Sequence, residues 1–156
     1  MNKPETLINS GLIGKIPENI DNNETKIIVE KLDDKKILRF YVEWKLFLAT
    51  YVSPWTLWHR TPKVKTKWKN KPDKYHTSSE YPEAEKKKNW VKGWAVMPYA
   101  VHVDGWVWIH GSDGRINGQL QSHWCIRTPL FYVKEIYEKV KELGIDTVTI
   151  DTTGIY

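Results

Sequence analysis

A thiol, two imidazoles and a guanidinium lie close together near the end of the chain, at Cys125, His110, His123 and Arg127. A thiol attacks a carbonyl carbon as its thiolate, so it needs a base or a positive environment beside it. Histidine is the side chain whose ordinary pKa suits that base near neutral pH. Cys125 is the single cysteine, so no disulfide forms within this chain. The group predicts a cysteine nucleophile, with His110 as its general base, acting on a peptide-type carbonyl.

Such a reaction also needs groups that hold the base and stabilise the developing negative charge. The second ring nitrogen of the base needs a partner, often a backbone carbonyl, that fixes its tautomer. The carbonyl oxygen of the substrate needs donors, usually backbone N–H groups beside the nucleophile. The loop that ends at Cys125 runs into a helix predicted to open near Thr128. We expect this loop to supply both donors, and the helix dipole to add a favourable potential.

The elements that must position these residues are mostly strands. Residues 1–24 are polar and rich in turn residues, which predicts a flexible N-terminal lead-in. Turns are expected at Asp33–Asp34, at Glu43–Lys45 and at Asp104–Gly105, between β-rich runs. Residues 61–92 are lysine-rich and contain three prolines, which predicts a long loop with at most short strands. The predicted strands are 27–29, 37–42, 46–52, 95–103, 106–109 and 147–150.

A helix is predicted directly after the cysteine. Thr128 is its expected N-cap, with Pro129 at the first helical position and Gly144 as the left-handed C-terminal residue. Apolar residues between them recur at three- and four-residue steps. They are Leu130, Val133, Tyr137 and Val140. The sequence therefore predicts a mainly β domain over residues 25–156, with one late helix.

These motifs resemble the catalytic domain of L,D-transpeptidases of the YkuD type. That family has a His-Gly pair, a loop, and then Ser-His-Gly-Cys followed by an aliphatic residue and Arg or Asn. This chain has His110-Gly111 and then Ser122 to Arg127. The resemblance covers roughly Lys26 to Ile150 and implies a β-sandwich with one short C-terminal helix after the catalytic loop. Further segments that match in order are Lys36–Val42, Val52–Ser53, His59–Pro62 and Met97–Tyr99.

The resemblance implies an activity on peptidoglycan stem peptides. Cys125 would attack the amide after the third residue of a stem and release the terminal D-amino acid. The resulting thioester would pass its acyl group to an amine of a second stem, forming a crosslink, or to another acceptor or water. His110 would be the general base. The substrate would place the protein outside the cytoplasm, in the periplasm or cell wall, although no signal peptide is visible in the first twenty residues.

The resemblance also implies roles for the residues around the nucleophile. The backbone at Gly111 and Ser112 would orient His110, and the N–H groups of Trp124 and Cys125 would form the oxyanion hole. Three further side chains would line the cleft: His123, Arg127, which would hold the loop or a substrate carboxylate, and Tyr99 on the acyl-donor side. The remaining histidines, His59, His76 and His102, have no compelling spacing and are expected to be ordinary residues.

Tryptophan stands at several positions where the family has glycine. Trp124 replaces the glycine beside the nucleophile, and Trp44, Trp58, Trp106 and Trp108 also lie in turn-like or glycine-rich contexts. A tight turn favours glycine, and a bulky residue is strained there if its φ is positive. We hypothesise a single cause for these tryptophans: the gene contains UGA codons that the cell reads as glycine, and the printed sequence shows them as tryptophan. The rival interpretation is a divergent homologue with impaired catalysis that binds cell-wall peptides.

Charge and composition narrow the remaining classes of function. The net charge is +5, with the excess concentrated in lysine runs at 63–74 and 86–88. A solvated face is the commoner meaning of such runs, and attraction to a polyanion is the functional one. A basic, aromatic-rich nucleic-acid binder is therefore a weaker alternative, and our leading hypothesis involves no nucleic acid.

No apolar run is long enough to span a membrane. No metal site or cofactor is expected, since one thiol with scattered histidines fits none of the usual zinc spacings. The sequence leaves the oligomeric state open.

Overall fold

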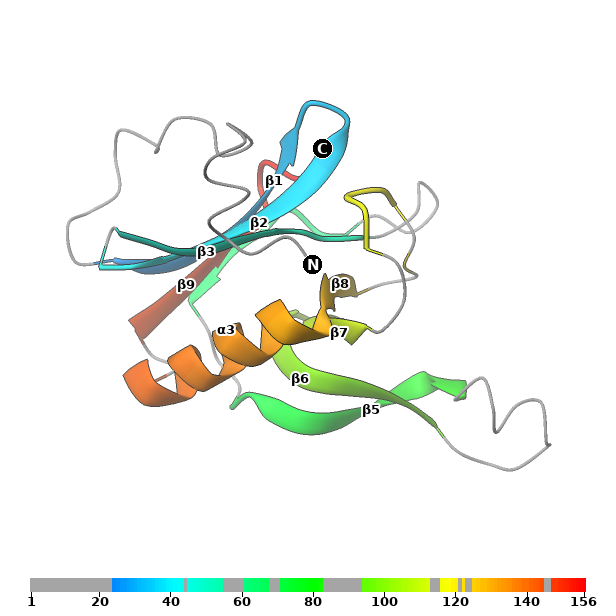
Figure 1. The fold of residues 1–156 in the computed structure, drawn as a ribbon. Helices are drawn as coiled ribbons and strands as arrows, with labels where there is room; N and C mark the ends of the chain where they lie inside the picture. The colour runs from blue at the N-terminus through cyan, green and yellow to red at the C-terminus, as the bar shows by residue number, and fades with distance from the viewer. Residues whose placement is uncertain are drawn as a thin grey trace.

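Two β-sheets and a helix make up the described part of this computed structural model (Figure 1). The structure describes residues 24–43, 45–54, 61–67, 71–82, 94–112, 116–120, 122, 125–144 and 147–156. The predicted lead-in, residues 1–24, lies outside these ranges except for its last residue. The prediction of a mainly β fold with a late helix is confirmed.

The first sheet has five strands in the order β3-β2-β1-β9-β4. Its strands are β1 (Thr25–Leu32), β2 (Lys35–Val42), β3 (Lys45–Tyr51), β4 (Lys65–Lys67) and β9 (Val148–Asp151). The turn at Asp33–Asp34 joins β1 to β2 as predicted, and β2 and β3 form the expected hairpin. The C-terminal strand β9 pairs in parallel with β1 and antiparallel with β4, and it therefore joins β4 to the rest of this sheet.

The second sheet has four strands in the order β5-β6-β7-β8. They are β5 (Asp73–Pro82), β6 (Trp94–Asp104), β7 (Val107–Ser112) and β8 (Ile126–Pro129). The prediction of at most short strands in 61–92 is wrong, because β5 is ten residues long. Strand β5 is polar and lies at the edge of its sheet, so its sequence lacks the alternation of apolar and polar residues that marks a half-buried strand. It is held by its pairing with β6, which local sequence does not reveal.

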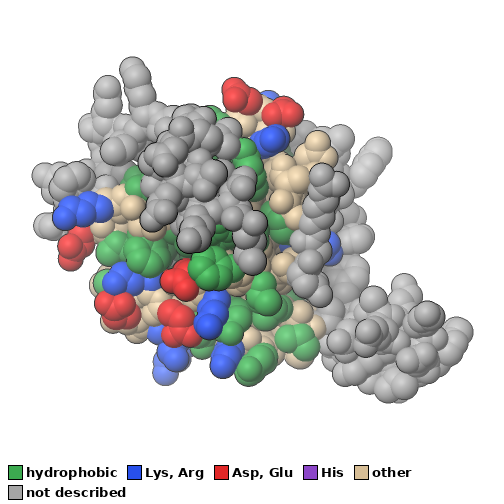
Figure 2. Space-filling model, in the orientation of Figure 1, with side chains coloured by type: hydrophobic (Ala, Val, Ile, Leu, Met, Phe, Trp, Pro, Cys, Tyr) green, Lys and Arg blue, Asp and Glu red, His purple; other side chains and the backbone are tan. Residues whose placement is uncertain are grey.

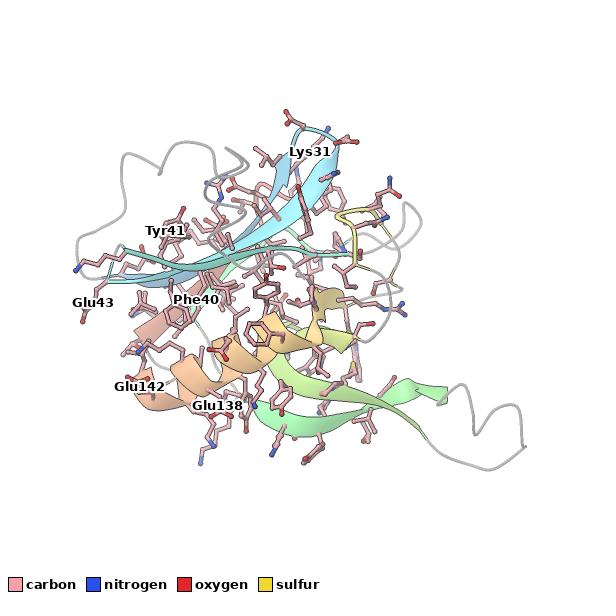
Figure 3. All side chains as sticks on the ribbon, in the orientation of Figure 1. Lys31, Phe40, Tyr41, Glu43, Glu138 and Glu142 are labelled. Carbon is pink, nitrogen blue, oxygen red and sulfur yellow. The ribbon has the colours of Figure 1, made fainter. Side chains whose placement is uncertain are left out.

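Helix α3 (Leu130–Leu143) follows β8 without a loop and packs on β7, β6 and β8. Thr128 is not its N-cap: the residue is buried within β8, Pro129 occupies the cap position, and no side chain caps the helix. The prediction for Gly144 is confirmed, since this C-cap residue has a φ of 86°. Glu138 and Glu142 point from α3 into solvent, so the helix presents its apolar face inward (Figure 3).

The core fills the space between the two sheets and α3. Phe40 of β2 points toward the helix, whereas its neighbour Tyr41 lies on the other side of the sheet (Figure 3). Buried side chains from both sheets and the helix form one cluster. Its members from the strands and the helix include Ile27, Leu38, Phe40, Ile109, Ile126, Val133, Ile136 and Ile150. This core fixes the four-stranded sheet against α3 and therefore fixes the side chains on the opposite face of that sheet.

Charged side chains of both signs lie together on the surface around α3 (Figure 2). Strand β4 exposes Lys65 and Lys67 at the edge of the five-stranded sheet. Exposed lysines on an edge strand discourage pairing with another chain. No helix in the described ranges is long and apolar enough to cross a membrane.

Candidate active site

Strand β7 has two chemically different faces. Val107, Ile109 and Gly111 are buried, whereas the residues between them are partly exposed. Successive side chains of a strand point to opposite faces of the sheet. The buried set faces the core and α3. The alternate set, Trp108, His110 and Ser112, faces the other side, and we call that side the site face of the four-stranded sheet.

Gly111 allows α3 to approach β7 closely. A β-carbon at this position would lie 2.7 Å from Leu130 Cδ1, 3.0 Å from Val133 Cγ1 and 3.1 Å from Pro98 Cγ. These separations are shorter than ordinary van der Waals contact. The His-Gly pair therefore has a physical reason in this fold, because glycine lets the helix pack directly behind the histidine.

His110 is held by its own backbone neighbour. Its Nδ1 lies 2.8 Å from the carbonyl oxygen of Gly111. Because a carbonyl oxygen only accepts hydrogen bonds, Nδ1 carries the proton and Nε2 presents a lone pair. Burial lowers the pKa of His110 to about 4, against a raising effect of the Gly111 hydrogen bond and with smaller lowering effects of Arg127 and His76. The imidazole is thus neutral near pH 7 and able to accept a proton at Nε2.

Strand β8 brings the cysteine beside this histidine. β7 and β8 run parallel, and His110 pairs with Arg127 across the sheet. Ile126 and Thr128 are buried, so Arg127 lies on the site face with His110. Cys125 directly precedes β8 and lies two residues before Arg127. Residues two apart in an extended chain point to the same face and are about 7 Å apart.

Contacts of the thiol place Cys125 on this face independently. Its Sγ lies 3.8 Å from the carbonyl oxygen of Trp106 and 3.9 Å from Met97 Sδ. Met97 pairs with His76 on β5, and the His76 ring stacks on Trp108, a site-face residue. The thiol and the His110 imidazole therefore lie on the same face of the four-stranded sheet.

The segment at Ser53 and Pro54 holds both flanks of the cysteine loop. Ser53 exchanges two backbone hydrogen bonds with Arg127, at 2.9 and 3.0 Å, and the N–H of Ser122 donates to the carbonyl of Pro54 at 3.3 Å. Ser53 is fully buried and Ser122 nearly so. The Val52–Ser53 motif and the following Pro54 thus anchor the backbone on either side of Cys125.

The other predicted site residues differ in their placement. His123 and Trp124 lie outside the described residues, so their roles remain predictions. Ser112 ends β7 on the site face. Tyr99 has a φ of 54°, and its ring packs edge-on against Tyr137 of α3 at 5.3 Å. The structure thus places the Tyr99 ring on the helix side of the sheet rather than beside Cys125.

Two histidines that the sequence left as ordinary residues lie on the site face. His76 stacks on the Trp108 ring at 4.0 Å, and His102 meets the same ring edge-on at 4.8 Å. Their approach depends on the pairing of β5, β6 and β7, which the sequence pattern did not reveal. The local signal was the three-residue spacing of Asp73 and His76, whose Oδ2 and Nδ1 atoms lie 3.2 Å apart. Within the described ranges, no group of three or more metal-binding side chains is assembled.

Comparison with solved structures identifies the architecture. The Ldtfm–avibactam carbamoyl enzyme superposes with a TM-score of 0.64 over 88% of this chain, at 19% identity. An L,D-transpeptidase (Yku) from Stackebrandtia nassauensis gives a TM-score of 0.63 over 88% of this chain, at 16% identity. The catalytic domain of the E. faecium L,D-transpeptidase acylated by ertapenem gives 0.60 over 86%, at 18% identity. The chain has the L,D-transpeptidase fold. The predicted resemblance is therefore confirmed at the level of the fold.

No protein-family model and no curated protein sequence matches the chain. The likeness lies in the three-dimensional arrangement, as expected at such low identity. The chain spans 51% and 58% of the first two L,D-transpeptidase-fold structures and 98% of the E. faecium catalytic domain.

Proposed function

We propose that this chain is a cysteine L,D-transpeptidase that acts on peptidoglycan stem peptides. The observation that carries the proposal is the placement of Cys125 and His110 on one face of the β7–β8 pair within an L,D-transpeptidase fold. A neighbour of the same fold is acylated by ertapenem, and another forms a carbamoyl enzyme with avibactam. These are acyl-transfer reactions of the kind that an activated thiol performs. In this proposal residues 25–156 form the catalytic domain.

In the first half-reaction, Nε2 of His110 takes the proton of the Cys125 thiol. The sulfur bonds to the carbonyl carbon after the third stem residue, and the negative charge on oxygen is stabilised by N–H donors at Trp124 and Cys125. Burial makes protonated His110 costly, with its pKa at about 4. Proton transfer therefore accompanies the attack, and the proton passes on to the departing amine of the terminal D-amino acid. The product is a thioester on Cys125.

In the second half-reaction, an amine of another stem peptide attacks the thioester carbonyl. The carbon–sulfur bond breaks, and the two stems are joined by an amide; water in place of the amine gives hydrolysis. Arg127 lies on the site face beside His110 and is the candidate to hold a substrate carboxylate. Since stem peptides lie outside the cytoplasmic membrane, this function places the protein in the periplasm or cell wall.

Ertapenem is the probe that tests the nucleophile. The chain is incubated with ertapenem and its intact mass is measured, and a stem tetrapeptide is then assayed for release of its terminal D-amino acid. We expect one adduct and D-amino acid release, both abolished in Cys125→Ala. The matched control is His102→Gln, a site-face change that leaves Cys125 and His110 in place. An adduct that persists in Cys125→Ala, or no release from the tetrapeptide, contradicts the proposal.

A binding module that has lost catalysis is the second candidate, because Trp124 stands beside the nucleophile where the family has glycine. The coding triplet decides between the two origins of this residue. A UGA codon at position 124 supports glycine in the living cell, and a UGG codon makes tryptophan genuine. With a UGG codon, Trp124→Gly separates the functions. Faster adduct formation in this variant than in the parent indicates an impaired enzyme, and equal rates indicate that Trp124 is compatible with catalysis.

A further inference from the structure

His76 on β5 is held in a defined tautomer by Asp73. One carboxylate oxygen of Asp73 accepts the N–H of Tyr75 at 3.0 Å, and the other lies 3.2 Å from His76 Nδ1. The backbone bond fixes the carboxylate, and the carboxylate draws the ring proton to Nδ1. The second nitrogen, Nε2, is then left as the acceptor, as in catalytic histidines that are oriented by a carboxylate.

The ring of His76 is also fixed in space on the site face. It stacks on Trp108 with centroids 4.0 Å apart and an angle of 27° between the planes. Its Cα partner across the β5–β6 pair is Met97, whose Sδ lies 3.9 Å from Cys125 Sγ. His76 is therefore one side chain away from the thiol. Its charge lowers the pKa of His110, which is a sign that the two imidazoles are close.

The two imidazoles belong to different strands of the four-stranded sheet. His110 is on β7 beside Arg127 of β8, whereas His76 is on β5, at the opposite edge of the four-stranded sheet. His110 donates to a backbone carbonyl, and His76 pairs with a carboxylate. A carboxylate partner stabilises an imidazolium, so the second arrangement suits a group that must hold a proton.

We propose that His76, oriented by Asp73, is a second general base that accepts the proton of the amine acceptor during thioester aminolysis. This inference rests on the proposed L,D-transpeptidase function and assigns its second half-reaction. The amine nitrogen bonds to the thioester carbonyl carbon, the carbon–sulfur bond breaks, and Cys125 leaves as thiolate. The amine proton passes to Nε2 of His76. The acceptor is thus an amine-bearing peptide that approaches from the β5 side.

His76→Gln tests the proposal, because glutamine keeps a polar side chain but cannot take the proton. Two rates are measured separately: formation of the ertapenem adduct, and transfer from a stem tetrapeptide to glycine amide as the amine acceptor. We expect an unchanged adduct rate and aminolysis reduced by about 10²-fold, the usual contribution of a general base. Asp73→Asn should give a smaller loss of aminolysis, since it keeps the acceptor for the Tyr75 N–H.

His102→Gln is the matched control. His102 contacts the same Trp108 ring, but its Nε2 is bonded to the Gly105 carbonyl at 2.9 Å, so it has no role in the proposed proton transfer. Hydrolysis of the thioester in the absence of amine is followed as well. It should fall less than aminolysis in His76→Gln, which raises the ratio of hydrolysis to transfer.

The pH profile of aminolysis gives a readout that a structural role would not move. The rate of aminolysis is measured against pH for the wild-type chain and for His76→Gln, and we expect the two profiles to differ in shape. The other titratable or charged groups on the strands of this sheet include Asp73 and Lys74 on β5, His102 on β6, His110 on β7 and Arg127 on β8. A changed aminolysis profile in His76→Gln, together with an unchanged pH profile of adduct formation, supports the assignment.

Three results would overturn the inference. One is unchanged aminolysis in a folded His76→Gln variant, and another is an equal loss in His102→Gln. If His76→Gln does not fold, as judged by its melting curve, Asp73→Asn must reduce aminolysis and spare the adduct, or the inference fails. The third is a wild-type chain that forms no ertapenem adduct and releases no D-amino acid. This outcome contradicts the proposed function itself. If the adduct and D-amino acid release are intact and aminolysis is unaltered in His76→Gln, only the assignment of His76 fails.

Discussion

The two faces of strand β7 have opposite tasks. Ile109 faces the core with an exposure of 0%, and the neighbouring His110 faces the site, held by the carbonyl of Gly111. Both belong to one six-residue strand, so the same backbone fixes a core side chain and the His110 imidazole. The difference shows how a small sheet supports chemistry: residues at every second position secure the strand, and those between them are free to be reactive.

The largest expected effect is on the site face. His110→Gln removes the base but keeps a polar side chain of similar length. We expect the rate of ertapenem adduct formation to fall by about 10²- to 10⁴-fold, the range of general-base contributions, with little change in the melting temperature at pH 7. Stopped reactions analysed by intact mass measure the rate. A comparable rate in the variant would exclude His110 as the base.

The second effect is on the core face. Ile109→Ala removes a fully buried side chain between the sheet and α3. We expect the free energy of unfolding to fall by about 2–5 kcal/mol, the usual cost of such a truncation. Urea denaturation monitored by tryptophan fluorescence gives the value. Ile109→Val is the milder control and should cost about 1 kcal/mol. If Ile109→Ala is as stable as the parent, the core face has been assigned incorrectly.

The apolar face and the motif residues were the predictable part of the molecule. Runs such as Ile27 to Val29 and Ile37 to Val42 mark strands because their side chains are buried, and Gly144 marks a helix end because its φ is positive. Cys125 and His110 stood out because their types carry chemistry. Local sequence was sufficient wherever burial or backbone geometry imposed a residue type.

The polar strand β5 was not predictable from local sequence. Its residues Asp73 to Pro82 are mostly polar, and the strand exists through pairing with β6. The place of His76 near Cys125 depends on that pairing and therefore on contacts distant in sequence. Thr128 was misassigned as a helix cap because β8 passes directly into α3, a junction that the usual cap pattern does not describe.

The third expected effect is a pH dependence of the free energy of unfolding that comes from the site-face residue His110. The pKa of His110 is lowered to about 4 from an ordinary 6.5, so the unfolded chain binds this proton more tightly than the folded one. The stabilisation is fully present above pH 6.5 and is lost as the pH falls toward 4, by up to about 3 kcal/mol. Urea denaturation at pH 7 and pH 4.5 measures it. The pH dependence should shrink in His110→Gln; if both chains lose equal stability, other groups are responsible.

The smallest effect arises where the two faces meet, at Gly111. Gly111→Ala would bring a β-carbon within 2.7 Å of Leu130 Cδ1 and 3.0 Å of Val133 Cγ1. Overpacking of this kind costs about 1–3 kcal/mol. Because the Gly111 carbonyl holds His110, we also expect slower ertapenem adduct formation. Leu130 is 43% exposed, so the double variant Gly111→Ala/Leu130→Ala relieves the shorter clash at little cost of its own. Recovery of both stability and adduct rate in the double variant would show that the close approach of α3 positions the base. Recovery of stability alone would limit the role of Gly111 to packing.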